Sequence, residues 1–570
     1  MPHPDLTVPV LIAGGSLVGL STSLFLGRHG IPHLLVERRP TTSTHPRGRG
    51  NNIRTMEIFR TAGLEPAIHQ AAATLADNHG IWQTPALTSP AGRWLVPPTA
   101  TDTTDAHLSP TTWCLCSQND LEPVLAHHAR THGGDLRFAT ELLTFHPDPD
   151  GITATVKDHH TGHHTTVRAR YLIAADGPRS PIRHQLGIGH SGPGPLFHNI
   201  SITFRAPHLT DLLAGRRFMM CYLTGPDADG ALLPVDNHQH WVFHAPYHPD
   251  RGQTPEDFTP ARCADHIRRA LGTPDLDLEI TGTAPWHAAE RVALTYRAGP
   301  VFLAGDAAHE MSPTGAFGAN TGIQDAHNLA WKLAAVLSGW AGEELLDSYD
   351  TERRPVAQAT ATRASTRSAE HHHPGYTPEN HPSTGPAGPG SGAGKPAGPG
   401  GGPLAALLPV ALAYRYPRGA VLDTDPATPI LPATADLTGA PGSRAPHLWL
   451  HPPTRPTHRI STLDLYERTP VLLTGAGRPT GWHPAATDLA TRLGIPLTCY
   501  RLGTTDDADW TPTPHTPGAD GPDWAAAHGI TPDGAILIRP DGFVAWRSPQ
   551  PVPDPTTTLH HVLTTLFHRT

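Results

Sequence analysis

The sequence predicts an α/β protein, in which a Rossmann-like dinucleotide-binding domain carries an inserted antiparallel β-sheet and is followed by a second α/β domain. Three observations predict this fold. A strand–turn–helix–strand pattern opens the chain, alternating apolar and polar segments fill residues 182–286, and a Pro- and Gly-rich segment covers residues 371–403. With 570 residues the chain is also too long for one hydrophobic core.

The opening pattern contains most of the glycine signature of a dinucleotide site. After the apolar run of residues 8–13, Gly14 and Gly19 supply the first and third glycines of G-x-G-x-x-G, and Ser16 occupies the middle position. Glycines let the backbone approach a pyrophosphate, and Ser16 is small enough to allow this and could donate a hydrogen bond to phosphate. Glu37, at the end of the second strand, would accept the hydroxyls of an adenosine ribose. An ordinary tight turn is the alternative interpretation.

A second motif indicates that the dinucleotide is FAD. An apolar strand over residues 301–304 ends at Gly305 and Asp306, which places the carboxylate to bind a ribityl hydroxyl. The Gly-rich loop of residues 313–322 then leads into a long amphipathic helix. Its backbone amides could face the edge of a flavin ring, where negative charge develops on reduction. A plain helix-entry loop is the alternative.

The inserted segment offers candidates for contact with a substrate. Residues 218–225 are typical of a strand that lines a large apolar pocket, and Tyr222 could donate a hydrogen bond to a substrate oxygen. Tyr222 could equally be a core residue of the sheet. His309 could lie near the flavin, although a structural role is expected, and Trp331 and Leu333 are expected in the core.

The composition excludes several classes of protein. A net charge of −9 argues against a nucleic-acid binder, and no apolar run reaches the roughly 20 residues that span a bilayer. The first residues show no signal-peptide pattern, so we expect a cytoplasmic protein. The five cysteines form no C-x-x-C pair and no zinc pattern, so no metal site is expected. The histidines at 371–373 are expected to be part of a solvated linker.

Four sequence motifs resemble those of the class A flavoprotein aromatic hydroxylases. GDAAHEMSPTGAFGANTGIQDAHNLAWKLAAVL is similar to their second flavin motif, and AADGPRSPIR to their Asp-Gly motif. SQNDLEPVLAHHA resembles a helix start with Gln-x-x-x-Glu, and HPRGRGNNIRTMEIFRTAGL resembles the region that carries an FAD-contacting Arg. The resemblance covers most of residues 8–367 and is closest to hydroxylases that tailor aromatic polyketides in actinomycete antibiotic pathways.

The resemblance implies a domain plan of the para-hydroxybenzoate hydroxylase type. FAD-binding segments are expected at 1–181 and 287–370, with parts near 80–115 belonging to the substrate layer, and the substrate-binding sheet at 182–286. A disordered linker is expected at 371–403. The segments PGSRAPHLWL and GAILIRPDGFVAWR resemble a thioredoxin-like domain, expected at 404–570. With Cys499 as its single cysteine this domain cannot run a dithiol cycle, so a structural or oligomerising role is expected.

Carried over residue by residue, the resemblance gives a set of FAD contacts. They are Gly14, Gly15, Ser16, Leu17, Val18, Gly19, Glu37, Arg38, Arg47, Gln118, Asp176, Asp306, Pro313, Gly318, Ala319 and Asn320. Ser16, Ala316 and Ala319 depart from the common pattern, but all three are small.

The resemblance also implies the reaction. NADPH or NADH reduces the flavin, O₂ adds at its C4a carbon, and the resulting hydroperoxide hydroxylates a bulky polycyclic aromatic polyketide. A homodimer is compatible with the family, and neither nucleic acid nor membrane is expected as a partner. Three alternatives stay open: the same flavin chemistry used as a Baeyer–Villiger, epoxidising or ring-cleaving oxygenase; a flavin dehydrogenase or oxidase; and a non-catalytic scaffold.

Overall fold

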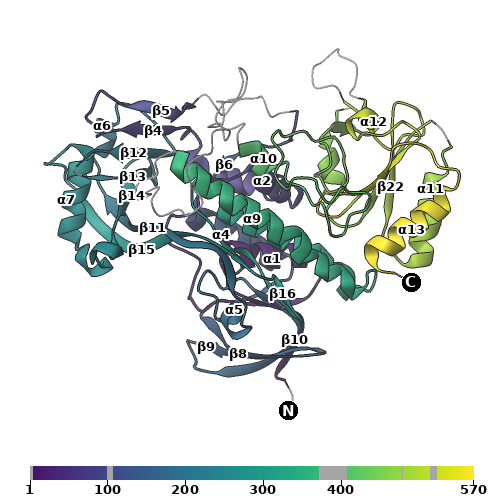
Figure 1. The fold of residues 1–570 in the computed structure, drawn as a ribbon, viewed down its shortest axis with the longest axis horizontal. Coiled ribbons are helices and arrows are strands. Elements are labelled where there is room, and N and C mark those ends of the chain that lie inside the picture. Colours follow the sequence, from purple (N-terminus) through teal and green to yellow (C-terminus); the bar gives the residue numbers. More distant parts are fainter. Residues whose placement is uncertain are drawn as a thin grey trace.

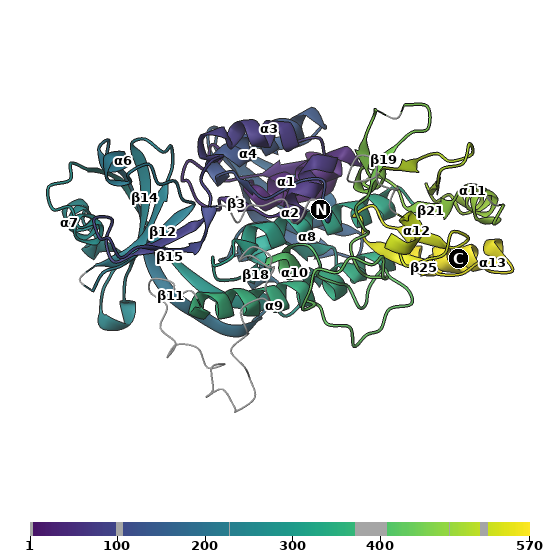
Figure 2. The same cartoon turned by 90° about the horizontal axis from the view of Figure 1, so that it is seen from above.

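A computed structural model describes residues 4–98, 107–226, 228–370, 407–455, 457–477, 479–513 and 523–569. The expected linker at 371–403, with the histidines at 371–373, lies outside the described residues. In Figures 1 and 2 a central α/β core lies between an antiparallel sheet at one end and the C-terminal module, residues 407–569 as described, at the other.

The core is built on an eight-stranded, mainly parallel sheet. Its main path runs β16 (Arg297–Ala298), β17 (Val301–Leu303), β10 (His164–Ala174), β1 (Leu6–Ala13), β2 (His33–Val36) and β7 (Asp135–Arg137), and β9 (Gly151–Asp158) pairs with β10 and with β8 (Thr140–Asp148). The central strand β1 pairs in parallel with both β2 and β10. Its second half is buried on both faces, which explains the unbroken apolar run of the sequence.

Helices cover this sheet and carry the loops that meet at its edge. They are α1 (Leu17–Arg28), α2 (Ile53–Thr61), α3 (Glu65–Ala71), α4 (Gln118–Thr131), α5 (Pro181–Gln185), α8 (Phe317–Leu337) and α9 (Asp347–Glu370). α1 packs against both α4 and α8. The two short strands β3 (Gly50–Asn51) and β6 (Cys114–Leu115) pair with each other just before α2 and α4. Trp331 and Leu333 on α8 are buried, as expected.

A second eight-stranded sheet stands beside the core. Its order is β18 (His309–Glu310), β15 (Glu279–Ala293), β11 (His190–Arg205), β14 (His240–Pro246), β13 (Asp229–Pro234), β12 (Met220–Thr224), β4 (Ile81–Thr84) and β5 (Arg93–Val96). Helices α6 (Leu209–Leu212) and α7 (Pro260–Leu271) belong to the same part of the chain. β15 runs past the expected end of the insertion at residue 286, because it is one continuous strand that pairs with β11 as far as Ala293.

The two faces of this second sheet differ in what they pack against. One face forms a large cluster with Phe204, Trp241 and Phe243 at its centre, together with residues of α7. The opposite face carries a smaller apolar cluster that includes Tyr222 and Val242. Because side chains alternate along a strand, Tyr222 and Val242 point away from the face that packs with α7.

The C-terminal module contains a four-stranded sheet in the order β22 (Thr498–Leu502), β21 (Val471–Gly475), β24 (Ala535–Ile538) and β25 (Val544–Ser548). Helices α11 (Trp482–Leu493) and α13 (Pro555–Phe567) pack together beside it. Smaller elements are α10 (Leu408–Ala411), α12 (Trp524–Ala527), β19 (Trp449–His451), β20 (Ile460–Ser461) and β23 (Thr511–Pro512). The thioredoxin-like assignment of this module stays a prediction. Among the described helices, none has the length and apolar character needed to cross a membrane.

Candidate active site

The turn between β1 and α1 admits only glycine at two positions. Gly14 has a φ of 110°, and a Cβ atom there would lie 2.1 Å from the carbonyl oxygen of Ala175. A Cβ atom on Gly19 would lie 1.8 Å from the carbonyl oxygen of Gly14. Both distances are far shorter than van der Waals contact, so this turn lies directly against the chain that leaves β10.

The N-terminus of α1 is open to an anion. Ser16 is its N-cap residue, but within the described turn its side chain caps no N–H group, and the turn has no acidic residue. Unpaired N–H groups and the helix dipole attract phosphate there. Arg47 adds positive charge nearby: its side chain is exposed, bonds to no described residue, and feels the charges of Glu122 and Asp306. Burial nevertheless lowers the pKa of Arg47.

The hydroxyl of Ser16 forms its hydrogen bonds within the protein. This hydroxyl donates to Oε1 of the buried Glu122 at 2.5 Å and accepts a hydrogen bond from Gln118 Nε2 at 2.8 Å. Glu122 also accepts from the backbone N–H of Ser43 at 2.6 Å. A buried carboxylate requires hydrogen-bond donors, so the Ser16 hydroxyl donates to Glu122 and not, as we expected, to a phosphate. Sequence reasoning named Glu122 only as part of the Gln-x-x-x-Glu pattern, although its i+4 spacing from Gln118 places both on one helix face.

Glu37 lies over the same turn. Its Oε2 accepts from the N–H of Gly15 at 2.7 Å, and its Oε1 accepts from the N–H of Arg39 at 2.9 Å. Each oxygen keeps a further lone pair for a ribose hydroxyl. Arg38, the next residue, is exposed at the edge of the site.

The segments that precede α8 meet α1 at close range. Gly305 has a φ of 61°, and its Cβ would lie 2.6 Å from the Val18 side chain, as would that of Gly322. Leu17, beside Val18, is buried in the core. With Gly14 packed on Ala175, these contacts bring the three motifs near residues 14, 176 and 306 together at one end of the parallel sheet, where α/β proteins bind ligands.

Asp306 is exposed, and it directly follows Gly305 after strand β17. Partial burial among neighbouring groups nevertheless raises the pKa of its carboxyl. Arg47 and His309 oppose this increase through their charges. The Asp306 carboxylate accepts no hydrogen bond from any residue that the structure describes. It is therefore available to a hydroxyl of a bound molecule.

Behind Asp306, His309 belongs to the supporting structure. His309 Nε2 and Asp325 Oδ2 lie 2.8 Å apart, and both side chains are fully buried. Asp325 also accepts from Arg353 Nε at 2.8 Å and from the N–H of Gly305 at 3.2 Å. This network fixes the loop between β17 and α8. The contacts of His309 therefore agree with the structural role that we expected for it.

The loop before α8 presents a second open helix terminus. Ala316 is the N-cap residue with a φ of 54°, and no side chain caps this end in the described structure. Pro313 is exposed, while Gly318 and Ala319 are half-buried in the first turn. Asn320 is buried, and its amide bonds three backbone groups, so only its main chain is left for a cofactor.

The Asp-Gly motif is tied to the same loop. Asp176 Oδ2 accepts from the N–H of Ile182 at 3.2 Å, whereas Oδ1 is buried without a partner among the described residues, and burial raises the pKa of this carboxyl. Arg183, from the same motif, donates to the carbonyl of Ala307 at 2.7 Å and to that of Pro178 at 3.0 Å. Arg183 thus joins two cofactor motifs, a role that sequence reasoning did not assign.

The face of the second sheet that lies away from α7 carries Tyr222. This side chain is 3% exposed, and burial raises its pKa, while the charge of Arg367 acts in the opposite direction. Arg367, near the end of α9, is itself buried, and its Nε has no partner in the described part of the chain. The sequence offered no signal for Arg367, because it lies far from Tyr222 along the chain and its charge acts on Tyr222 only in the folded structure.

Residues 45–49 join the cofactor site to this sheet. His45 Nε2 and Ser201 Oγ on β11 lie 3.0 Å apart, and Arg49 donates to the carbonyl of Pro234 on β13. Arg49 is buried, and burial lowers its pKa to about 10. The cofactor motifs and the sheet face with Tyr222 therefore border one region of the molecule.

Comparisons with known proteins agree with this geometry. An FAD binding domain family matches residues 7–364, and an aromatic-ring hydroxylase C-terminal family matches residues 438–570. A Streptomyces halstedii protein assigned as a polyketide hydroxylase is 62% identical, over 98% of this chain and 97% of its own. The tetracenomycin A2 monooxygenase-dioxygenase of Streptomyces glaucescens is 41% identical, over 99% and 97% of the two chains.

A solved structure is similar along the whole chain. The crystal structure of aklavinone-11 hydroxylase in a ternary complex with FAD and aklavinone superimposes with a TM-score of 0.84 at 34% identity, covering 100% of both chains. The predicted fold class is confirmed by this match.

Proposed function

This chain belongs to the FAD-dependent aromatic-ring hydroxylases, and from that premise we propose that it hydroxylates a polycyclic aromatic polyketide with NAD(P)H and O₂ as co-substrates. Its relatives include a tetracenomycin A2 monooxygenase-dioxygenase and an aklavinone 12-hydroxylase. The chain covers almost the full length of these relatives, which supports a shared activity.

One observation carries the proposal: charged groups without protein partners converge with two open helix termini. Arg47 and the start of α1 suit a pyrophosphate, Asp306 suits a ribityl hydroxyl, and the start of α8 suits the electron-accepting edge of a flavin. The groups present therefore fit FAD. When bound, the flavin supplies the reduction and oxygen chemistry that side chains lack.

The remaining task of the chain is to control protons on the substrate. Because burial raises its pKa, Tyr222 stays protonated at neutral pH and can donate a hydrogen bond to a substrate oxygen. The buried cation of Arg367, whose charge acts on Tyr222, would stabilise a phenolate on the same substrate. Electron-rich phenolates react faster with electrophilic oxygen, so this pair would raise the rate of hydroxylation. We therefore assign Tyr222 and Arg367 to the substrate.

The proposal is tested with FAD-loaded protein, NADPH or NADH, ¹⁸O₂ and a panel of polycyclic phenols and quinones. A substrate should accelerate NAD(P)H oxidation, and its product should contain one labelled oxygen. Oxidation of NAD(P)H that never labels a product would instead indicate an oxidase.

A second candidate function has a specific observation behind it. Two relatives that are 41% identical are named monooxygenase-dioxygenases, of tetracenomycin A2 and of tetracenomycin B2. The chain could thus insert more than one oxygen atom into its substrate. The same labelling experiment separates the two candidates, because the product would then carry two or more labelled atoms.

A further inference from the structure

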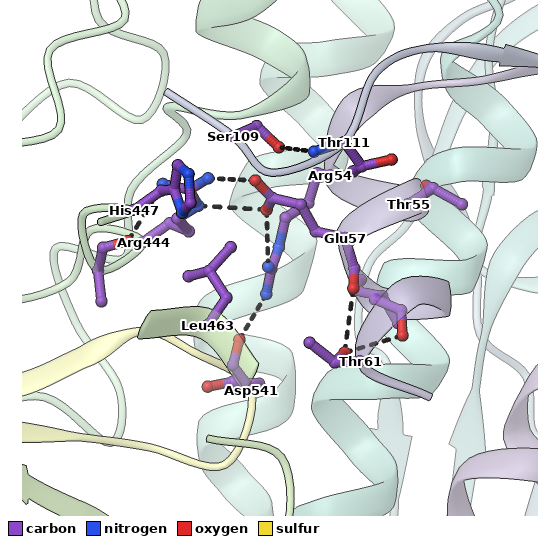
Figure 3. A network of polar contacts seen from close by, with 12 residues as sticks. Arg54, Thr55, Glu57, Thr61, Ser109, Thr111, Arg444, His447, Leu463 and Asp541 are labelled. Carbon is purple, nitrogen blue, oxygen red and sulfur yellow. Dashed lines mark hydrogen bonds and ion pairs between the residues drawn. The ribbon is translucent and has the colours of Figure 1, made fainter. Parts of the chain in front are cut away.

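Arg444 of the C-terminal module reaches deep into the cofactor domain. Its fully buried guanidinium donates to both oxygens of the Glu57 carboxylate on α2, with 3.2 Å between Nε and Oε2. It also donates to the carbonyl of Leu108 at 2.7 Å. In Figure 3 the Glu57 carboxylate lies between the guanidinium groups of Arg444 and Arg54.

The bonds of Arg444 to Glu57 and to Leu108 lie on the two chain segments that flank the small β3–β6 sheet. Glu57 lies on α2, which directly follows β3, and Leu108 lies a few residues before β6. α2 has nine residues and is about 13 Å long at 1.5 Å per residue. A shift of Glu57 would therefore tilt the whole helix and move its N-terminus.

That N-terminus is bonded to the loop that precedes α8. The N–H of Asn52, the N-cap residue of α2, donates to Asn320 Oδ1 at 2.9 Å. Asn320 Nδ2 in turn donates to the carbonyl of Gly50 on β3 at 2.7 Å and to that of Ala316 at 2.6 Å. Hydrogen bonds and helix α2 thus connect Arg444 without interruption to the proposed flavin loop.

A second contact from the same module limits the movement of α2 relative to α8. The backbone carbonyl of Asp541 accepts from Arg54 on α2, and its carboxylate accepts from Asn328 on α8 at 3.2 Å. One residue of the C-terminal module therefore binds both helices whose N-termini are joined by Asn320. A short helix fixed at such points behaves as a rigid part.

We propose that Arg444 is a positioning residue for the flavin: through Glu57 and α2, the C-terminal module sets the place of the loop that holds the flavin ring. This inference rests on the proposed use of FAD. It gives the module a part in the cofactor site itself, beyond the structural or oligomerising role that its single cysteine suggested. The loss of the Arg444 charge should then affect flavin binding and the fate of oxygen, and not stability alone.

The test compares Arg444→Met, Glu57→Gln and the double variant. Arg444→Met removes one of the two cations beside Glu57 but leaves the Arg54–Glu57 pair, so it should lower the thermal midpoint only moderately. The double variant also takes the counterion of the buried Arg54 and should be less stable still. FAD affinity should fall about threefold to thirtyfold in Arg444→Met and stay low in the double variant. A larger share of NAD(P)H oxidation should then yield H₂O₂ in place of hydroxylated product.

Trp482→Phe serves as the matched control. Trp482 is buried inside the C-terminal module, where it donates to the carbonyl of Asp533 and contacts Trp546. This substitution should lower the thermal midpoint without changing FAD affinity or the yield of H₂O₂. Arg444→Lys keeps the charge and should bind FAD more tightly than Arg444→Met; it carries the test if the Met variant does not fold.

The inference is overturned if Arg444→Met binds FAD as tightly as the natural chain, or if Trp482→Phe loses as much FAD affinity as Arg444→Met at a similar thermal midpoint. Failure of the proposed function has a different signature, because the natural chain itself would then bind no FAD.

Discussion

At Gly14 the chain turns from β1 into α1 with a φ of 110°, and the carbonyl oxygen of Ala175 occupies the space of a side chain. Gly14→Ala would place a methyl carbon 2.1 Å from that oxygen. The turn must then open, which moves the N–H groups of α1 away from a pyrophosphate. We expect this variant to lose bound FAD, as measured by flavin released from the purified protein.

Gly30→Ala is the matched control for this prediction. Gly30 also has a positive φ, 72°, but nothing lies within 4 Å of its Cβ position. The substitution should cost about 1 kcal/mol of stability through backbone strain and leave FAD binding intact. Equal FAD loss in the two variants would show that strain, and not the contact with Ala175, is responsible.

We propose that Tyr222 serves the hydroxylation of the substrate and not the binding of the cofactor. Tyr222→Phe removes the hydroxyl that we assign to the substrate oxygen, so kcat should fall by about 100-fold while FAD affinity is unchanged. Tyr247→Phe is the control, since Tyr247 is also nearly buried but lies in the cluster on the opposite sheet face. An unchanged kcat in Tyr222→Phe would assign Tyr222 to the core of the sheet.

Among the elements, α8 and α9 are joined by a buried charge network centred on Asp325. Burial opposes ionisation, but Arg353 and His309 outweigh it and hold the pKa of Asp325 below its usual range. Asp325→Asn leaves the buried Arg353 without a counterion, which should cost about 3–5 kcal/mol. Urea denaturation would measure this loss. A loss below about 1 kcal/mol would mean that the network contributes little to the α8–α9 packing.

The end of α2 is held to the C-terminal module by Glu467, and this contact predicts a pH dependence. Burial alone would raise the pKa of Glu467, but the hydrogen bond with His327 and the charge of Arg28 outweigh burial and lower this pKa to about 2. The carboxylate therefore stabilises the folded chain above the unfolded pKa of 4.5, and this stability is lost as the pH falls from 4.5 toward 2.

Glu467→Gln should remove that dependence. Between pH 4.5 and 3, the natural chain should lose about 1.4 kcal/mol of stability per pH unit more than the variant, because its unfolded state binds one further proton. Urea denaturation midpoints at several pH values would measure the difference. Parallel pH profiles for the two chains would contradict the assigned contact.

The elements whose signals are local were predictable from the sequence. Strand β1, helix α1 and the loop before α8 follow from apolar runs, helical periodicity and glycine spacing within about 20 residues. Partners that are distant in sequence were not. The charge of Arg367 acts on Tyr222 although the two residues lie far apart in the sequence, and Ser16 bonds to Glu122 because α4 packs on α1.

At the scale of the whole molecule, three parts share one site. The second sheet supplies the face with Tyr222, the core supplies the cofactor loops, and the C-terminal module anchors α2 and α8 (Figure 2). The order of these parts could be predicted from the sequence, since their patterns are separate along the chain. The anchoring could not, because Arg444 and Glu57 lie 387 positions apart and nothing in the two segments that contain them indicates that they pair.

The most direct test of the account is the flavin content of the purified, folded protein. If the segments near Gly14, Asp176 and Asp306 hold one molecule, the protein should be yellow and contain one FAD per chain, and the colourless protein should regain FAD when it is supplied. A folded protein that shows no flavin absorbance and takes up no added FAD would contradict the account.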